Sequence, residues 1–179
     1  MRMPPAAFSL FLLLPSLAAA CALPPGVPRE ASPEAFVIER DLAGDTIARG
    51  EFSAINGVRR GFTAYLSGVR AGDTFTLSER FEYDDGEKDQ KTWVLTLKGD
   101  GQYAGTREDV VGEAKGWQDG AAFRLAYDAR LPDDKGEPGL RVHFQDVMVK
   151  TPAGVVLNRA SVGKWGFQVA TVKLEIRRP

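Results

Sequence analysis

Cysteine and histidine are nearly absent from this chain of 179 residues, which has one of each, Cys21 and His143. One cysteine cannot form a disulfide within the chain. A zinc site needs three or four His, Cys or carboxylate ligands, so here it would need mostly carboxylates. Triad catalysis and haem ligation would both depend on His143, which lies in the polar phase of a predicted strand. We therefore expect an exposed structural histidine, no metal, no cofactor and no catalytic residue.

Basic runs and phosphate-binding glycine motifs are also lacking. The formal net charge is −1 and the basic residues are dispersed, so the sequence indicates no nucleic-acid partner. Neither a P-loop nor a dinucleotide-binding fingerprint is present. The acidic segment Asp84-Asp85-Gly86-Glu87, with Asp89 beyond it, does not match the calcium-loop pattern of alternating acidic or amide residues before a glycine. We interpret this segment as a charged hairpin turn.

Long apolar runs are missing except at the N-terminus. The run from Phe8 to Leu14 is apolar apart from Ser9, and it is too short to cross a bilayer as a helix. Arg2 precedes this run and the small residues Ala18–Ala20 follow it. This order is typical of a signal peptide, which we predict over residues 1–20.

Cys21 stands directly after the small residues and allows two interpretations. The first is a lipobox similar to the bacterial lipoprotein pattern of Leu, small, small, Cys, although Ala18 occupies the usual leucine position and Leu17 lies one residue earlier. The second is cleavage by a general signal peptidase after Ala18–Ala20. We favour acylation of Cys21, because a lone cysteine in an oxidising compartment has no partner within the chain. Ala22 follows it instead of aspartate, which favours an outer-membrane lipoprotein facing the periplasm.

Prolines are concentrated just after this cysteine. Residues 21–44 contain Pro24, Pro25, Pro28 and Pro33, which preclude a regular helix or a central strand. Segments of this composition are extended spacers. We therefore predict a lipidated N-terminus and a tether over residues 21–44, in which the apolar residues 36–38 could dock on the domain that follows.

Residues 45–179 show apolar residues spaced by two, as in half-buried strands. Such alternation occurs in the segments 62–66, 75–83, 93–97, 123–131, 140–148 and 172–176. Turn signals such as Asn56-Gly57 and Asp119-Gly120 separate them. The apolar phase changes between Phe167 and Val172, which predicts a bulge or bend near Ala170.

Eight to ten strands joined by short turns have two common solutions, an up-and-down barrel and a curved open sheet or sandwich. The barrel has no exposed edges, since every strand is paired on both sides. We favour the barrel and predict an all-β domain over residues 45–179, an antiparallel up-and-down meander closed as a lipocalin-like (calycin) barrel.

An ordered series of residues spans most of this domain: Asp84-Asp85-Gly86-Glu87, Trp93, Leu95, Tyr103, Gly105, Asp109-Val110-Val111-Gly112, Ala114, Leu131-Pro132, Asp146, Met148, Asn158-Arg159-Ala160, Lys164 and Gly166. The series resembles a bacterial lipoprotein family without an assigned activity, the domain of unknown function 3833 family. That resemblance implies export and lipidation, consistent with Cys21, and supplies no catalytic residue. One departure is Val147, where the family leads us to expect tryptophan; a binding site that used this tryptophan would be altered here.

Two acids, Glu79 and Asp146, interrupt the apolar phase of their strands. Both should point into the core or a cavity, and a buried carboxylate is costly unless it is paired or hydrogen-bonded. Arg159 shares the phase of Val155 and Leu157 and is the predicted partner. The cluster of Glu79, Asp146 and Arg159 is either a structural network that fixes register or a polar patch at the base of a ligand cavity. A catalytic carboxylate pair is the third interpretation.

Two classes of function come first, neither of them enzymatic, and an enzyme comes third. The first is a membrane-tethered module that binds a small apolar or amphipathic ligand inside the barrel. The second is a structural or envelope-assembly lipoprotein whose barrel is filled by side chains and which acts through its outer surface. A barrel of this size can be filled or can hold one small ligand, so the volume of its interior discriminates the two hypotheses.

Overall fold

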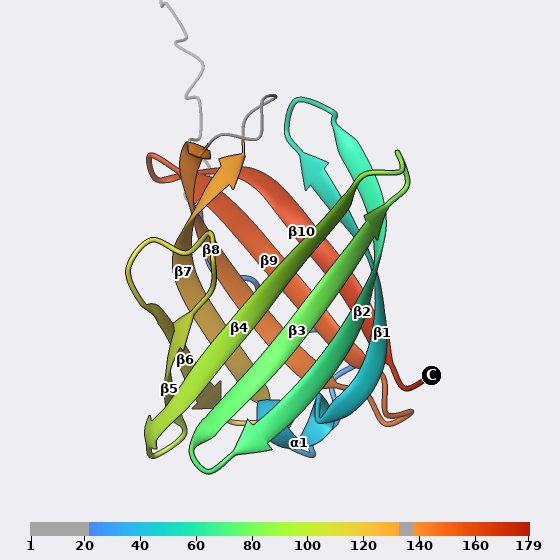
Figure 1. Ribbon diagram of the computed structural model, residues 1–179, viewed down its shortest axis with the longest axis vertical. Coiled ribbons are helices and arrows are strands. Elements are labelled where there is room, and N and C mark those ends of the chain that lie inside the picture. Colours follow the sequence, from blue (N-terminus) through green and yellow to red (C-terminus); the bar gives the residue numbers. More distant parts are fainter. Residues whose placement is uncertain (1–21, 133–137) are drawn as a thin grey trace, which may run out of the picture.

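The computed structural model describes residues 22–132 and 138–179, which form one closed antiparallel barrel preceded by the short helix α1 (Ile38–Asp41) (Figure 1). Each strand pairs with its neighbours in sequence, and the last strand pairs with the first. The predicted all-β, lipocalin-like meander is confirmed. The strands are β1 (Gly44–Ala54), β2 (Arg59–Ala71), β3 (Thr74–Tyr83), β4 (Lys88–Gly99), β5 (Gln102–Thr106), β6 (Ala114–Asp119), β7 (Ala122–Pro132), β8 (Pro138–Lys150), β9 (Val156–Lys164) and β10 (Phe167–Arg177).

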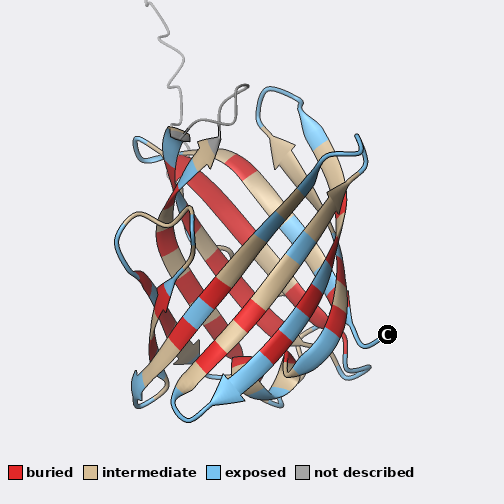
Figure 2. Cartoon of the chain, viewed as in Figure 1, coloured by how far each residue is buried: buried red, intermediate tan, exposed pale blue. Residues whose placement is uncertain are grey.

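Alternation along each strand separates an inner face from an outer one. On β2, Phe62, Ala64 and Leu66 are buried, while the residues between them are more exposed, and the same alternation is visible along other strands (Figure 2). Successive side chains of a strand point to opposite faces of the sheet, so each apolar phase lines the barrel interior. The phase change near the C-terminus is a bulge between Gln168 and Ala170, as predicted.

The hairpins turn where the sequence predicts them. Gly57 and Gly86 adopt positive φ angles of 91° and 88°, a conformation that glycine adopts without a steric penalty. The segment around Gly86 is a charged turn, as expected: Asp85 accepts hydrogen bonds from Arg60 Nε and Nη2 at 2.7 and 2.9 Å, and Glu87 also pairs with Arg60.

The two ends of the barrel differ. At the lower end in Figure 1, α1 and its flanking residues cover the opening. Phe36, Ile38 and Leu42 are almost fully buried in the core cluster, and Phe36 packs edge-on against Phe123 with ring centroids 6.4 Å apart. A Cβ at Gly68 would collide with the Leu42 carbonyl oxygen, so glycine lets this segment approach β2. The hairpins β1–β2, β3–β4 and β9–β10 surround the opposite, upper end.

The proline-rich segment differs from the free spacer we expected, because it packs along the outside of the barrel. Ala22 N donates to Gly166 O (2.8 Å) at the upper end, Ser32 N donates to Lys150 O (2.7 Å), and Phe36 N donates to Ala121 O (3.0 Å) at the lower end. We call residues 22–37 the N-terminal arm. Among the described residues, no helix is long and apolar enough to cross a bilayer.

A second apolar cluster lies outside the barrel on β8 and β9, and Ala31 of the N-terminal arm packs against it. Its buried members are Ala122, Val147, Val149, Val155 and Leu157. Both faces of β8 and β9 are therefore apolar, which is the usual pattern of strands covered on both sides. Val147, where the family resemblance suggests tryptophan, belongs to this outer cluster and does not line the interior.

Candidate ligand cavity

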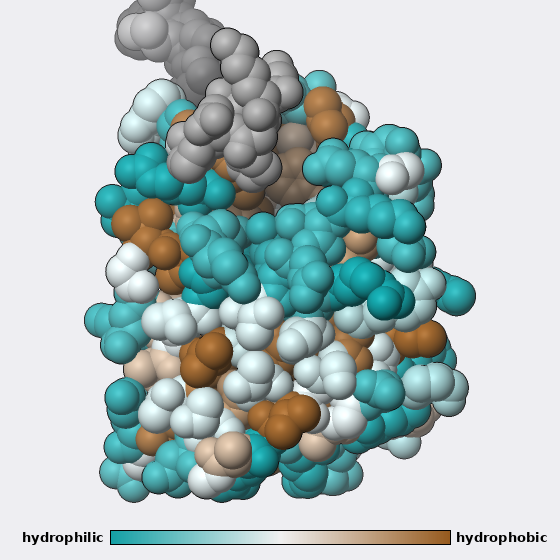
Figure 3. Space-filling model, viewed as in Figure 1, coloured by the Kyte–Doolittle hydropathy of each residue, from teal (hydrophilic) through white to brown (hydrophobic). Residues whose placement is uncertain are grey.

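A cavity of about 400 Å³ occupies the barrel interior. Ile38 and Leu42 form part of its floor, and its lining extends to Val58 and Arg60 in the upper hairpins. Val58 is half exposed, and the upper end of the molecule is visibly hollowed (Figure 3). The volume lies in the lower part of the range of roughly 300–1,000 Å³ that is usual for small-molecule sites. Among the described residues, the barrel is thus a cup that α1 closes at the floor and that the hairpins leave accessible at the upper end, the mouth.

Aromatic rings form much of the cavity wall. Tyr127 stacks on Phe144 with centroids 5.0 Å apart, and Trp93 meets Tyr127 edge-on at 5.0 Å. Nearer the mouth, Phe81 stacks on Tyr83 at 6.1 Å. Such rings hold one another in place and offer a large apolar surface to a ligand.

A charged cluster interrupts this apolar wall, and Arg107 is at its centre. Its Nε and Nη2 donate to Asp109 Oδ1 and Oδ2 at 2.7 and 3.1 Å, and its guanidinium lies over the rings of Trp93 and Tyr127 at 4.6 and 5.2 Å. Its Nη1 is 3.6 Å from Glu79 Oε2. Only 10% of the Arg107 side chain is exposed, so it is an interior cation with its hydrogen bonds directed at Asp109.

The loop after the short strand β5 fixes this arrangement. Val111 N donates to Asp128 O at 2.8 Å, and Arg130 N donates to Asp109 O at 2.9 Å, so the loop continues the barrel wall along β7. Lys91 on β4 adds a second cation, with Nζ 3.0 Å from Asp89 Oδ2 and 3.3 Å from Asp109 Oδ2. Burial opposes ionisation of Asp109, but Arg107 and Lys91 together hold its pKa below the usual value.

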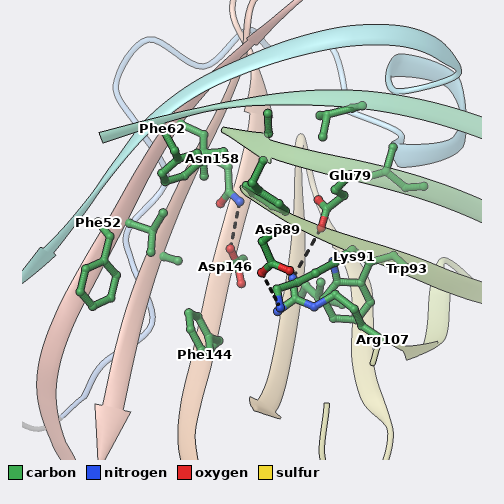
Figure 4. Close-up of a pocket in the computed structure, with 18 of the residues that line it drawn as sticks. Phe52, Phe62, Glu79, Asp89, Lys91, Trp93, Arg107, Phe144, Asp146 and Asn158 are labelled. Carbon is green, nitrogen blue, oxygen red and sulfur yellow. Dashed lines mark hydrogen bonds and ion pairs between the residues drawn. The ribbon is translucent and has the colours of Figure 1, made fainter. Parts of the chain in front are cut away.

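Both predicted acids face the cavity. Glu79 and Asp146 line it from β3 and β8, which lie on opposite sides of the closed sheet (Figure 4). Asp146 is 7% exposed and accepts a hydrogen bond from Asn158 Nδ2 at 2.9 Å. Burial raises the pKa of Glu79 to about 7 and that of Asp146 to about 6.

The prediction that Arg159 pairs with Glu79 or Asp146 is wrong. Its Nη1 donates to the Asn158 and Leu174 carbonyl oxygens at 2.9 and 3.0 Å, and it does not line the cavity. Arg159 shares the phase of Val155 and Leu157, but that phase faces the outer cluster beneath the N-terminal arm. An apolar phase marks the barrel interior only where the other face is exposed to solvent.

Arg107 lies beside Glu79 and Asn158 donates to Asp146, which are the contacts expected of Arg159. Neither residue is predicted from the sequence pattern. For Arg107 a signal exists, since it continues the inward phase of Tyr103 and Gly105, although β5 ends at Thr106. Asn158 has the phase opposite to that of Leu157, and only the docked arm shows that this phase is the inner one.

Three acceptor atoms in the cavity receive no hydrogen bond from any described protein group. They are Glu79 Oε2, Asp146 Oδ2 and Asn158 Oδ1, all buried. His143 lies elsewhere, with its side chain 47% exposed and Nδ1 2.9 Å from Asp128 Oδ1. In residues 22–132 and 138–179, no group of three His, Cys, Asp or Glu side chains is arranged to hold a metal ion.

A closed up-and-down barrel with a ligand-sized cavity defines the calycin-like class of β-barrel proteins. Within that class, the chain belongs to the family described as protein of unknown function DUF3833, whose model matches residues 17–178. Among solved structures, the S-type phycobiliprotein lyase CPES from Guillardia theta is similar in fold, with a TM-score of 0.56, 10% identity, and coverage of 78% of this chain and 88% of the lyase.

A redesigned β-barrel, mFAP1 bound to DFHBI, aligns with a TM-score of 0.41 and 10% identity, over 78% of this chain and 97% of that barrel. No curated protein sequence matches this chain. At such identities the likeness concerns the fold alone, so the activity of this protein has to be argued from its own residues.

Proposed function

We propose that this protein is an exported, membrane-tethered lipoprotein that binds one small amphipathic ligand inside its barrel and catalyses no reaction. The observation that carries the proposal is the cavity of about 400 Å³, with apolar walls and a charged cluster around Arg107. Apolar pockets with a few placed polar groups are the usual form of small-molecule sites.

The alternative, a structural or envelope-assembly lipoprotein with a filled barrel, is less well supported. Large side chains such as Phe144 and Leu125 line the interior but leave the volume between them open. A barrel that acted only through its outer surface would be more stable with that volume filled, because voids cost packing energy. An open interior therefore favours binding.

The composition of the cavity lining supports binding without catalysis. None of the described residues that line it is Cys, Ser, Thr or His, so the pairing of a hydroxyl or thiol nucleophile with a histidine base is not found there. The two acids Glu79 and Asp146 are accompanied by Arg107 and Asn158, which can position a ligand but supply no nucleophile.

Membrane attachment is supported by the position of Ala22 at the mouth of the barrel. Ala22 is hydrogen-bonded to Gly166 at the mouth, so acyl chains on its covalent neighbour Cys21 would join the barrel at that rim. Large apolar side chains are exposed in the hairpins there, among them Ile55 (77%) and Trp165 (85%). Tryptophan is enriched at the membrane–water interface. We therefore propose that the mouth faces the bilayer, in the periplasm at the outer membrane.

Native mass spectrometry of protein purified from the cells that produce it tests the ligand. We expect one small molecule per chain in the wild type, and loss of that molecule in Ala160→Phe, which fills the cavity from β9. The matched control is Ala126→Phe on β7, which is outside the cavity lining and should retain the molecule. Wild-type protein without any bound molecule, from cells grown under several conditions, would support the filled-barrel alternative.

A further inference from the structure

We infer that the polar end of the ligand is a hydrogen-bond-donating cation, a protonated amine attached to an apolar body. The inference rests on the proposed ligand-binding function and narrows the ligand to one chemical class. It starts from the acceptors that the barrel leaves without donors, Glu79 Oε2, Asp146 Oδ2 and Asn158 Oδ1. Buried acceptors without a partner cost free energy, so a ligand that supplies donors gains what the protein alone lacks.

The cations of the barrel direct their hydrogen bonds at other acids, although Arg107 Nη1 also lies 3.6 Å from Glu79 Oε2. Arg107 directs two hydrogen bonds at Asp109, and Lys91 pairs with Asp89 and Asp109. Among the described residues, no basic side chain lies within ion-pair distance of Asp146, which Arg107 influences only from farther away. The side of the cavity formed by β8 and β9 is therefore a place for a positive charge that the protein does not supply.

The residues that line the cavity include more acids than bases, which also favours a positively charged ligand. Five acidic residues line the cavity against three basic ones. The acids are Glu79, Glu87, Asp89, Asp109 and Asp146, and the bases are Arg60, Lys91 and Arg107. Walls of low polarity strengthen the field of such an excess, which attracts cations and repels anions.

The kinds of polar atom in the cavity favour an ammonium group over other polar ends. An ammonium has three N–H donors and no acceptor, and the three unmatched atoms named above are all acceptors. A hydroxyl has a single donor and brings an acceptor of its own. A carboxylate brings further acceptors and a further negative charge close to Glu79 and Asp146. The stacked rings of Tyr127 and Phe144 offer π faces, which also attract cations.

Displacement of the neutral dye Nile red by three amphiphiles with the same alkyl chain tests this inference. Dodecylamine, dodecanol and dodecanoate differ only in their polar end. Residues 22–179 contain all the strands that the structure describes, together with α1 and the N-terminal arm, so this fragment is used without the proposed lipid anchor. At neutral pH, we expect dodecylamine to displace the dye at a concentration about tenfold lower than dodecanoate, the effect of one charge-assisted hydrogen bond.

Two isosteric variants locate the preference. Asp146→Asn and Glu79→Gln should each reduce the advantage of the amine by about tenfold while Nile red still binds, which shows that the cavity is intact. Asp128→Asn removes an acid on the outer surface and should leave the advantage unchanged.

The outcomes separate the two proposals. Absence of Nile red uptake by the wild type would overturn the proposed ligand-binding function itself. Dye uptake with equal or better displacement by dodecanoate would overturn only the assignment of a cationic end. An amine preference that persists in both Asp146→Asn and Glu79→Gln would also overturn that assignment, because the charge would then act from elsewhere.

Discussion

At the scale of single residues, Arg107 organises the interior. Its guanidinium pairs with Asp109, lies near Glu79, and covers the rings of Trp93 and Tyr127. Arg107 lies just beyond the end of the short strand β5. The charged cluster therefore has a structural role as well as its proposed role towards a ligand.

Replacement of Arg107 by methionine should be strongly destabilising. It leaves Asp109 buried without its main partner, and breaking a buried pair in this way costs about 3–5 kcal/mol. Urea denaturation measures the change in the free energy of unfolding. The control is Arg141→Met, which removes an exposed pair with Asp128 and should cost about 0–1 kcal/mol. Equal costs for the two variants would show that the Arg107 pair contributes no more than a surface pair.

The two buried acids should make the barrel less stable as the pH rises. Their pKa values in the folded protein, about 7 for Glu79 and about 6 for Asp146, lie above the ordinary values of 4.5 and 3.8. Below about pH 3 both states hold most of these protons. Between about pH 3 and 7 the unfolded chain releases them first, so the free energy of unfolding falls.

Glu79→Gln should remove part of that fall, on the order of 1–3 kcal/mol. Urea denaturation at several pH values, compared with the wild type and with the exposed variant Glu175→Gln, measures the difference. If the wild type and Glu79→Gln lose stability in parallel from pH 4 to 7, Glu79 is not the group that titrates there.

At the scale of elements, the strands could be predicted because each alternates apolar and polar residues, and the turns because Asn56-Gly57 and similar pairs tolerate positive φ. The inward position of Glu79 follows from the same alternation. The predicted docking of residues 36–38 agrees with the burial of Phe36 and Ile38. The course of the preceding residues of the N-terminal arm could not be predicted, since a proline-rich segment has no periodicity that reveals what it packs against. That omission caused the error at Arg159: β9 is apolar on both faces, and only the docked arm distinguishes them.

The floor of the barrel depends on the N-terminal arm, and Phe36 is its largest fully buried side chain. Phe36→Ala should cost about 3–5 kcal/mol, the usual effect of truncating a buried phenylalanine. Leu23→Ala, on the same arm but 68% exposed, should have little effect. Urea denaturation of both variants provides the comparison. A small cost for Phe36→Ala would mean that the barrel is stable without its floor.

At the scale of the whole molecule, the proposed anchor and the cavity belong to the same end. Cys21→Ser should abolish labelling by a clickable fatty acid and release the protein from the membrane fraction, because acylation needs the thiol. Labelled gels and fractionation after osmotic shock measure both effects. Equal labelling of wild type and variant, or a wild type that is released by osmotic shock, would refute acylation at Cys21.

The pairing of β1 with β10 has a consequence for how the molecule is made. Ile47 lies opposite Arg177, so the first strand finds one of its two partners only at the very end of the chain. A polypeptide leaves the ribosome, or a translocation channel, with its amino end first. Until β10 follows, the outer edge of β1 presents unpaired N–H and C=O groups to any neighbouring strand. Closure is thus a late, long-range folding step, and chains truncated before β10 should aggregate.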